Sequence, residues 1–255
     1  MLQTRVIPVL LLKNRGLYKG VKFKNHTYVG DPINTVKIFN DKEVDELVLL
    51  DIEASKENNE IDFELIQEIA TEAFMPLAYG GGIRSVNDAQ KLFSIGIEKI
   101  IVNTLAVEKQ SVLTELIEKF GSQSIVVSID IKKNIFKKNQ LYIKSGTVKT
   151  KFTPIDFAKR MQDMGVGEIL LNSIDRDGMM NGYDLSMIEE MSVTLTVPLI
   201  ACGGAGKLED MRRAKLLGAS AVSAGSMFVY HGRHKAVLIS YPKYEKLCAL
   251  FEETE

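Results

Sequence analysis

Apolar and polar residues follow two patterns that alternate along this chain. Short apolar runs rich in β-branched residues, such as IVVSI from Ile125, are separated by longer segments in which apolar residues recur at helical spacing. The short runs predict eight strands, at residues 5–12, 46–52, 77–79, 99–103, 125–130, 168–173, 199–202 and 221–224. The longer segments predict eight helices, at residues 32–41, 62–73, 86–95, 111–120, 154–164, 185–191, 208–217 and 244–253.

Strands and helices that alternate eight times predict a (β/α)8 TIM barrel, formed as a single domain over residues 1–255. Asp31 followed by Pro32 is a good helix start, because the carboxylate can cap free N–H groups and proline already has a helical φ. A doubly wound open sheet is the alternative fold. It explains the glycine turns of the chain equally well, but the GxGxxG fingerprint of that fold is absent.

Two segments repeat one arrangement, which the open sheet does not explain. LAYGGGIRSVNDAQKLFSIGIEKIIVNT begins at Leu77, and IACGGAGKLEDMRRAKLLGASAVSAGS begins at Ile200. Each contains an apolar run, a glycine turn, a helix-like segment and a second apolar run, and the two lie about half the chain length apart. This repeat indicates that one half of the barrel is a duplicate of the other.

Composition narrows the classes of function. The chain has 255 residues, of which 45% are hydrophobic and 25% charged, as in a soluble enzyme domain. A net charge of −1 without a basic stripe predicts no nucleic-acid partner, and we expect the lysine-rich run at 132–138 to decorate a solvent-facing hairpin. Two cysteines and three scattered histidines predict neither a disulfide framework nor a metal site. Because no apolar stretch is long enough for a membrane span or a signal peptide, we expect a cytoplasmic protein without membrane contact.

Candidate chemistry lies where the predicted strands end, because TIM-barrel enzymes bind and react at the carboxyl ends of their strands. The polar or glycine residues at these ends are Lys13, Asp51, Gly80, Asn103, Asp130, Asn172, Asp175, Asp177, Gly203 and Ser223. Most of these aspartates could equally be helix caps or could order a loop. Asp130 differs because it ends the apolar run VVSID, where an ionised carboxylate is costly unless a reaction or a partner uses it.

The two glycine turns predict a ligand with an anionic group at each end. Backbone N–H groups converge where a strand ends in glycines and a helix begins, and they can hold a phosphate there. One predicted phosphate site comprises Gly81, Gly82, Asn103 and Thr104, and the other comprises Gly203, Gly204, Gly225 and Ser226. A structural alternative is that glycine only lets each helix pack closely on its strand. The pairing of the two sites favours an elongated bisphosphate.

Several motifs resemble the HisF family, the cyclase subunit of imidazole glycerol phosphate synthase, and the resemblance runs from Arg5 to about Phe228. The motifs are DELVLLDI, GGGIRS, FGSQSIVVSID, GEILLNSIDRDG with GYD, and IACGGAG. The resemblance implies a barrel that binds a bisphosphorylated ribosyl aminoimidazole carboxamide and needs no cofactor. It also implies a HisH-type glutaminase on the N-terminal face, whose ammonia crosses the barrel interior to the site of cyclisation.

Carried over residue by residue, the resemblance keeps only half of the family's acid/base pair. Asp130 matches the fifth-strand aspartate, whereas Leu11 stands where the family has an aspartate at the end of the first strand. Removing one proton-transfer group typically costs a factor of about 10²–10⁴ in rate. Met179 and Cys202 also depart from the family's threonine and serine. The matched motifs further imply two catalytic candidates, Lys19 in a mobile loop and Asp177, and add Asp51, Asn172 and Gly178 to the ligand site.

At the other end of the barrel the resemblance is complete. Arg5, Glu46, Lys99 and Glu168 match four charged residues that form a gate for ammonia in the family. Two positive and two negative groups can compensate one another across a narrow passage. The alternative is that the beginnings of strands facing solvent are often charged.

These matches favour a subunit that still moves ammonia but supplies it to a reaction other than the family's cyclisation. HisF-like relatives serve the amidination of surface sugars, where a HisH-like glutaminase and a separate ATP-dependent amidotransferase install an acetamidino group, and we favour this hypothesis because of Leu11. The main alternative is an ordinary cyclase of histidine biosynthesis. A non-catalytic scaffold would not need Asp130 or the glycine turns, and an isomerase of the HisA type would also need two acid/base groups.

Overall fold

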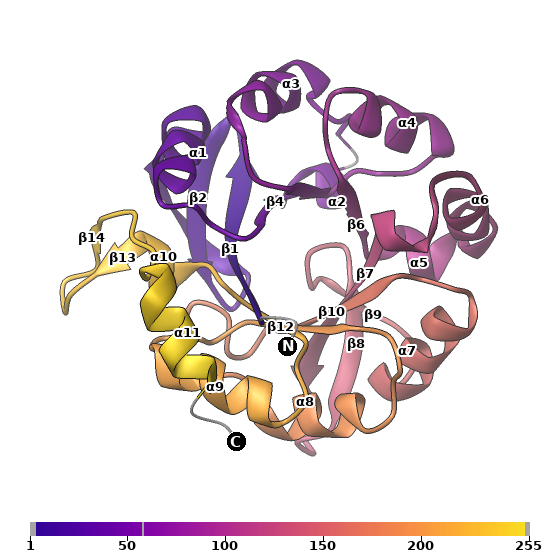
Figure 1. Ribbon diagram of the computed structural model, residues 1–255. Helices are drawn as coiled ribbons and strands as arrows, with labels where there is room; N and C mark the ends of the chain where they lie inside the picture. Colours follow the sequence, from indigo (N-terminus) through magenta and orange to yellow (C-terminus); the bar gives the residue numbers. More distant parts are fainter. Residues whose placement is uncertain (1–3, 58, 253–255) are drawn as a thin grey trace.

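The computed structural model describes residues 4–57 and 59–252, and these form a closed parallel barrel surrounded by helices (Figure 1). The predicted (β/α)8 barrel is confirmed. Its strands, in spatial order, are β1 (Arg5–Lys13), β4 (Leu47–Asp51), β5 (Leu77–Gly80), β6 (Lys99–Val102), β7 (Ile125–Lys133), β10 (Glu168–Ser173), β11 (Leu199–Cys202) and β12 (Ala221–Ala224). The barrel closes between β1 and β12, where Arg5 is in register with Ala221.

The alternation of side chains along each strand creates two apolar layers. On β7, Ile125, Val127 and Ile129 pack into the large layer between the strands and the helices. Val126 points the opposite way, into a smaller layer inside the barrel. Because every barrel strand is covered on both faces, the sequence shows continuous apolar runs there rather than strict alternation.

The predicted helices surround the strands with end positions that differ by a few residues. They are α1 (Pro32–Asp41), α3 (Phe63–Glu72), α4 (Val86–Ser94), α6 (Gln110–Phe120), α7 (Pro154–Asp163), α8 (Leu185–Ser192), α9 (Leu208–Leu216) and α11 (Tyr244–Glu252). The expected start of α1 is confirmed, since the carboxylate of Asp31 accepts a hydrogen bond from Asn34 N at 2.8 Å. Glu253, the last residue of the final predicted helix, lies outside the described residues.

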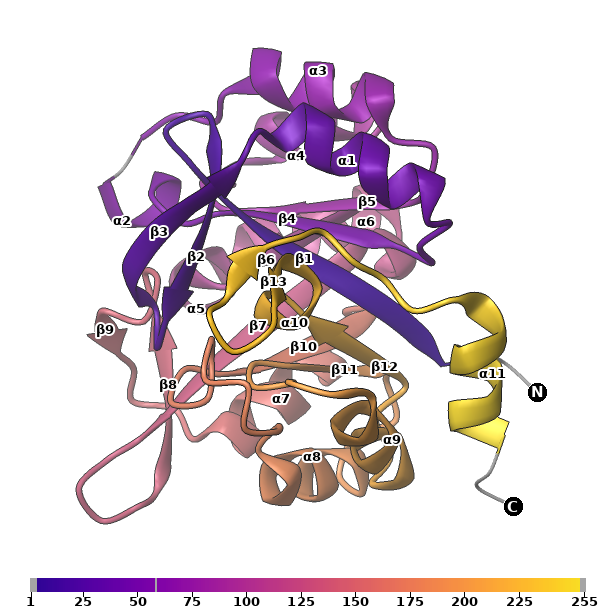
Figure 2. The ribbon, with the colours of Figure 1, turned by 90° about the vertical axis from the view of Figure 1, so that its left-hand side faces the viewer.

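Short elements that the apolar pattern did not predict lie in the connections between the barrel strands and helices, most of them after the carboxyl end of a strand. They are the hairpin β2 (Gly16–Val21) and β3 (Lys24–Gly30), the strands β8 (Asn139–Ile143), β9 (Val148–Lys149), β13 (Tyr230–His231) and β14 (Ala236–Val237), the short helices α2 (Ala54–Glu57), α5 (Thr104–Glu108) and α10 (Ser226–Val229), and a 3-10 turn (Ser122–Ser124). The side view shows β2, β3 and β9 together at one end of the barrel (Figure 2). The 132–138 run forms the turn between β7 and β8, so the expected solvent-facing hairpin is confirmed.

No helix in the described part of the chain has both the length and the apolar character needed to cross a lipid bilayer.

Candidate functional site

A cavity of about 300 Å³ opens at the carboxyl ends of the barrel strands. It contains most of the residues that the sequence places in the ligand site, namely Lys19, Asp51, Gly81, Asn103, Thr104, Asp130, Asn172, Asp177, Gly178, Gly203, Gly204, Gly225 and Ser226. Gly82 belongs to the first glycine turn and was predicted to hold a phosphate, but it does not line the cavity. The topology therefore gathers side chains that are scattered over the whole sequence into one pocket.

Asp130 is the buried carboxyl group of this pocket. Only 7% of the residue is exposed, and its Oδ1 accepts a hydrogen bond from the hydroxyl of Ser128 at 2.9 Å. Burial raises the pKa of Asp130 to about 7, and the charge of Asp177 adds to this, whereas the Ser128 hydrogen bond opposes it. A carboxyl group with a pKa near neutrality can both accept and donate a proton at the pH of the cell.

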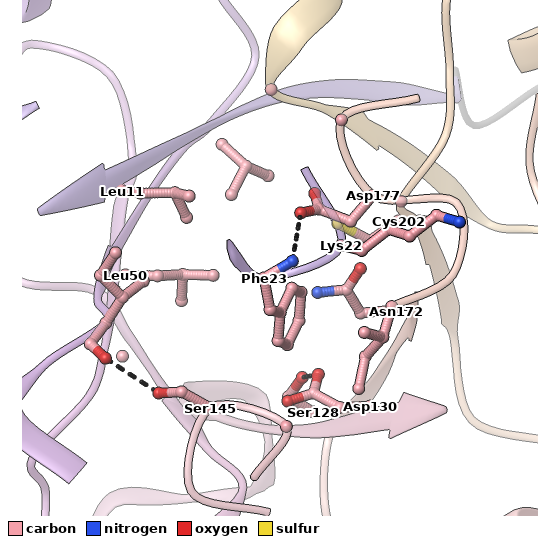
Figure 3. Close-up of a pocket in the computed structure, with 18 of the residues that line it drawn as sticks. Leu11, Lys22, Phe23, Leu50, Ser128, Asp130, Ser145, Asn172, Asp177 and Cys202 are labelled. Atoms are coloured by element: carbon pink, nitrogen blue, oxygen red, sulfur yellow. Dashed lines mark hydrogen bonds between the residues drawn. The ribbon is translucent and has the colours of Figure 1, made fainter. Parts of the chain in front are cut away.

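The wall that faces Asp130 is hydrocarbon. Leu11 and Leu50 are adjacent in the register of β1 and β4, and both line the cavity. In Figure 3 these two leucines lie on one side of the pocket, while Asp130, Asn172 and Cys202 lie on the other. The side chain at position 11 therefore cannot transfer a proton, while Lys13, at the end of β1, also lines the cavity and pairs with Glu53 at 2.5 Å.

Lys19 was expected in a mobile loop, but this expectation is wrong. It belongs to strand β2 and is 5% exposed, with its amine donating a hydrogen bond to the carbonyl oxygen of Val9. Burial lowers the pKa of Lys19 to about 8, although the charge of Asp177 partly opposes this. The sequence analysis missed the strand because the hairpin of β2 and β3 is short and mostly polar, although β2 pairs with β1 and buries Leu17 in the core.

The hairpin is held over the pocket by the loop that follows β10. The backbone N–H of Lys22 donates to the carbonyl of Asp177 at 2.9 Å, and that of Phe23 lies 3.4 Å from the Asp177 carboxylate (Figure 3). Gly178 packs so closely on the backbone of Gly20 that an added Cβ would collide with its carbonyl group. Asp177 thus positions the hairpin, and burial raises the pKa of its carboxyl group, although the charge of Lys19 opposes this.

Each of the two glycine turns contains two consecutive glycines with positive φ. Gly81 and Gly82 have φ values of 108° and 73°, and Gly203 and Gly204 have 83° and 116°. These values disfavour any residue with a side chain. A Cβ on Gly81 would also meet the carbonyl oxygen of Asp51. The duplication read from the sequence is therefore present as a repeated pair of positive-φ glycines.

Three of the predicted ligand residues are already engaged in structural hydrogen bonds. The amide of Asn103 donates to the carbonyls of Ser128 and Tyr142 at 3.0 and 3.2 Å. The Asp51 carboxylate accepts from the backbone N–H groups of Glu53 and Ala54, both at 2.9 Å. Thr104 Oγ1 accepts from Lys144 N at 3.1 Å. Asn103 and Asp51 therefore have the loop-ordering role that was the alternative for residues at strand ends.

Asn172 is the polar group of the pocket that lacks a partner. The residue is 5% exposed, and its Oδ1 has no hydrogen-bond partner among the residues that the structure describes. An unpaired buried amide costs free energy unless a ligand satisfies it. Cys202 beside it is inert as a nucleophile, because burial raises the pKa of its thiol to about 12.

Many pocket residues were not selected from the sequence, and four of them show why. They are Lys22, Leu50, Ser128 and Ser145. Ser128 could have been found, because it precedes Asp130 by two positions and the period of a strand places both on one face. Lys22 and Ser145 lie in or beside hairpin turns that carry no apolar periodicity.

A charged ring of Arg5, Glu46, Lys99 and Glu168 closes the opposite end of the barrel. Arg5 contacts Glu46 at 2.5 Å and Glu168 at 2.9 Å, and Lys99 contacts the same two carboxylates at 3.1 and 3.0 Å. Burial alone would raise the pKa of Glu168, but hydrogen bonds and the charges of Arg5 and Lys99 bring it below its ordinary value. The sequence anticipated this set of four, and the fold brings all of them together.

The interior between the ring and the pocket is lined by aliphatic side chains. The buried residues of this lumen are Ile7, Val9, Val48, Ala78, Ile101, Val126, Leu170, Ile200, Cys202 and Ala221, and Leu11 and Leu50 pack against them at the pocket end. Apolar side chains therefore fill the barrel interior between the ring and the pocket.

Comparison with known proteins places this geometry in a family. A family profile described as "Histidine biosynthesis protein" matches residues 5–235, which is most of the chain. The chain belongs to this family. Its relatives show more narrowly that it is a HisF-type chain.

Two groups of HisF relatives cover nearly the whole chain. The hisF2 protein of Pseudomonas aeruginosa, a provisionally assigned imidazole glycerol phosphate synthase subunit, is 52% identical over 97% of this chain and 99% of its own length. A HisF of Leptospira interrogans with the same provisional assignment is 50% identical over 98% and 100%. The imidazole glycerol phosphate synthase subunit HisF of Dictyoglomus thermophilum is 41% identical over 89% and 90%. The chain is thus more similar to the first two HisF proteins than to the third.

Proposed function

We propose that this HisF-type chain is the barrel subunit of a glutamine-dependent complex that delivers ammonia to another enzyme. A HisH-like glutaminase binds the N-terminal face, ammonia enters through the charged ring, and it leaves at the pocket on the C-terminal face. The acceptor is an ATP-dependent sugar amidotransferase of surface-polysaccharide synthesis, and the complex works in the cytoplasm.

The ring and the lumen support the transport part of this proposal. Four ion pairs hold the ring together, and each acidic member contacts both Arg5 and Lys99. Breaking one contact therefore leaves every charge with another partner, so that the ring can open without isolating a buried charge. Beyond the ring, the aliphatic lining suits the passage of a small neutral molecule.

The change of chemistry rests on a single observation, which is that Leu11 and Leu50 form a hydrocarbon wall where the cyclase needs its second carboxylate. Cyclisation requires proton transfers on two sides of the substrate, and a leucine can make none of them. The glycine turns and Asn172 still suit a phosphorylated small molecule, which would occupy the pocket as a ligand.

The alternative function is the cyclase of imidazole glycerol phosphate synthase in histidine biosynthesis. One observation favours it specifically, namely that the hairpin brings the amine of Lys19 to the backbone of Val9, two residues before Leu11. With a pKa of about 8, this amine could exchange protons in place of the absent carboxylate. Asp130 and both glycine turns would then keep their roles in the family.

The two functions are separated by supplying the bisphosphorylated ribosyl aminoimidazole carboxamide and free ammonium to the purified chain. We expect binding by calorimetry but formation of imidazole glycerol phosphate at least about 100-fold slower than in a HisF that carries the first-strand aspartate. A HisH-like glutaminase should still hydrolyse glutamine faster when the chain is added. Turnover equal to that of an ordinary cyclase would refute ammonia delivery and establish the alternative.

A further inference from the structure

The turn between β7 and β8 presents two large apolar side chains to solvent. Ile135 is 89% exposed and Phe136 is 75% exposed. In Figure 2 this turn projects from the barrel at the lower left, clear of the other elements. Adjacent exposed aliphatic and aromatic residues at a projecting tip are typical of an interaction site.

This tip is ordered by its own hydrogen bonds. The side chain of Asn134 accepts from the backbone N–H of Phe136 at 2.9 Å and from that of Lys138 at 3.0 Å. The backbone N–H of Asn134 also donates to the Lys138 carbonyl at 3.0 Å, which closes the turn. Ile135 and Phe136 are therefore held outward before any partner binds, so that binding costs little ordering of the backbone.

Lysines surround the apolar tip. The run KKNIFKK contains four lysines and no acidic residue, although the net charge of the whole chain is −1. Lys133 pairs with Asp184 at 3.1 Å, while Lys137 and Lys138 are exposed next to Phe136. The tip thus combines an apolar centre with a cationic rim, which is complementary to an apolar pocket with an acidic rim.

The tip also stands beside the mouth of the candidate site. Strand β7 carries Asp130 in the pocket and continues through Lys132, which lines the cavity, to the turn. A protein bound to the tip would therefore approach the face of the barrel at which ammonia leaves. Without a bound acceptor the ammonia would be protonated in bulk water, so that an acceptor enzyme has to dock at this face.

We propose that the tip formed by Ile135, Phe136, Lys137 and Lys138 is the docking point for the ammonia-accepting amidotransferase. The inference rests on the proposed function and names the surface through which that function is carried out. Phe136 and Ile135 insert into an apolar pocket of the acceptor, and the two lysines face acidic residues on its rim. Truncation of buried aromatic anchors is what most weakens protein interfaces.

The test uses the double variant Ile135→Ser/Phe136→Ser, a purified ATP-dependent sugar amidotransferase and a HisH-like glutaminase. We expect the variant to bind the amidotransferase at least about tenfold more weakly. It should also form less amidated sugar per glutamine hydrolysed, and an excess of ammonium chloride should restore product. Stimulation of the glutaminase should equal that of the parent. Ile38→Ser is the control, because Ile38 is an exposed apolar residue on helix α1, which lies across the barrel from the tip (Figure 2).

Each remaining outcome overturns the docking site. Equal binding and equal amidation by parent and double variant would do so while leaving ammonia delivery intact. Binding of the parent, but not the variant, to vesicles of phosphatidylcholine and phosphatidylglycerol without any binding to the amidotransferase would assign the tip to membranes instead. Rapid cyclisation with free ammonium would refute the proposed function itself, and the docking site with it.

Discussion

The two ends of the barrel treat buried charge in opposite ways. In the ring, each of two carboxylates contacts both Arg5 and Lys99, and the pKa of Glu168 is lowered in spite of burial. In the pocket, the carboxyl group of Asp130 has the Ser128 hydroxyl as its one hydrogen-bond partner among the described residues, and burial raises its pKa to about 7. The paired charges stabilise the ring, whereas the carboxyl group of Asp130, which has no ion-pair partner among the described residues, can exchange protons near neutral pH.

The largest expected effect is at the pocket end. Leu11→Asp should raise cyclisation with free ammonium by a factor of about 10²–10⁴, because it supplies the second proton-transfer group opposite Asp130. The measurement is kcat/KM with the bisphosphate substrate. Leu50→Asp, on the neighbouring strand, is the control and should give no such gain. Failure of Leu11→Asp in a variant that still binds the bisphosphate would mean that Leu11 is not what separates this chain from the cyclases.

At the ring end we expect a large effect on stability. Lys99→Met removes two of the four ion pairs and should lower the free energy of unfolding by about 2 kcal/mol, less than for fully buried pairs because Arg5 and Lys99 are partly exposed. Lys99→Arg should remain close to the parent. Urea denaturation gives the comparison, and bisphosphate binding should be unchanged. Weaker binding at the distant pocket would contradict the independence of the two ends.

The buried carboxyl group of Asp130 should lower stability as the pH rises. Its native pKa of about 7 lies above the ordinary value of 3.8, so between these pH values the native state holds a proton that the unfolded chain has lost. The free energy of unfolding therefore falls from about pH 4 to pH 7. Asp130→Asn should be more stable than the parent by about 1–3 kcal/mol at pH 8 and equal to it near pH 4.

Thermal denaturation of Asp130→Asn at several pH values measures this difference. Glu64→Gln is the control, because the carboxylate of Glu64 is 79% exposed and should show no such dependence. A variant that is less stable than the parent at pH 8 would show that the charge of Asp130 is compensated in solution.

The smallest expected effect compares two buried phenols. Tyr79 has a hydroxyl without a partner among the described residues, whereas the hydroxyl of Tyr183 donates to the Ser223 carbonyl at 2.8 Å. Tyr79→Phe should raise the free energy of unfolding by about 1 kcal/mol, and Tyr183→Phe should lower it by about the same amount. Equal destabilisation by both would show that Tyr79 has a solvent partner.

The barrel could be predicted because its strands and helices are buried on faces that the sequence marks with apolar residues. All eight strands and eight helices were found, with ends that differ by a few residues. The hairpin β2–β3, which extends β1, was missed because few of its side chains are apolar, and its turns depend on positive φ values at residues such as Asn14, Lys22 and Phe23. Polar residues in such turns give no periodic signal.

The candidate site was predictable as a set of residues but not as a set of contacts. Strand ends and glycine turns identified most of the pocket, since parallel strands of a barrel end on one face. Hydrogen bonds between distant segments decide which of these residues are available to a ligand. The amide of Asn103 donates to two backbone carbonyls, whereas Asn172 Oδ1 lacks a partner among the described residues. Such pairings depend on distances between segments that local pattern cannot supply.

The seam that closes the barrel has a consequence for how the chain is made. Arg5–Pro8 of β1 pair with Ala221–Ala224 of β12, so β1 is synthesised about 200 residues before the strand that covers its second edge. Until β12 pairs with β1, the apolar side chains inside the incomplete barrel are exposed to water. Nascent chains stalled before residue 221 should therefore depend on chaperones, and release of the final segment should end that dependence.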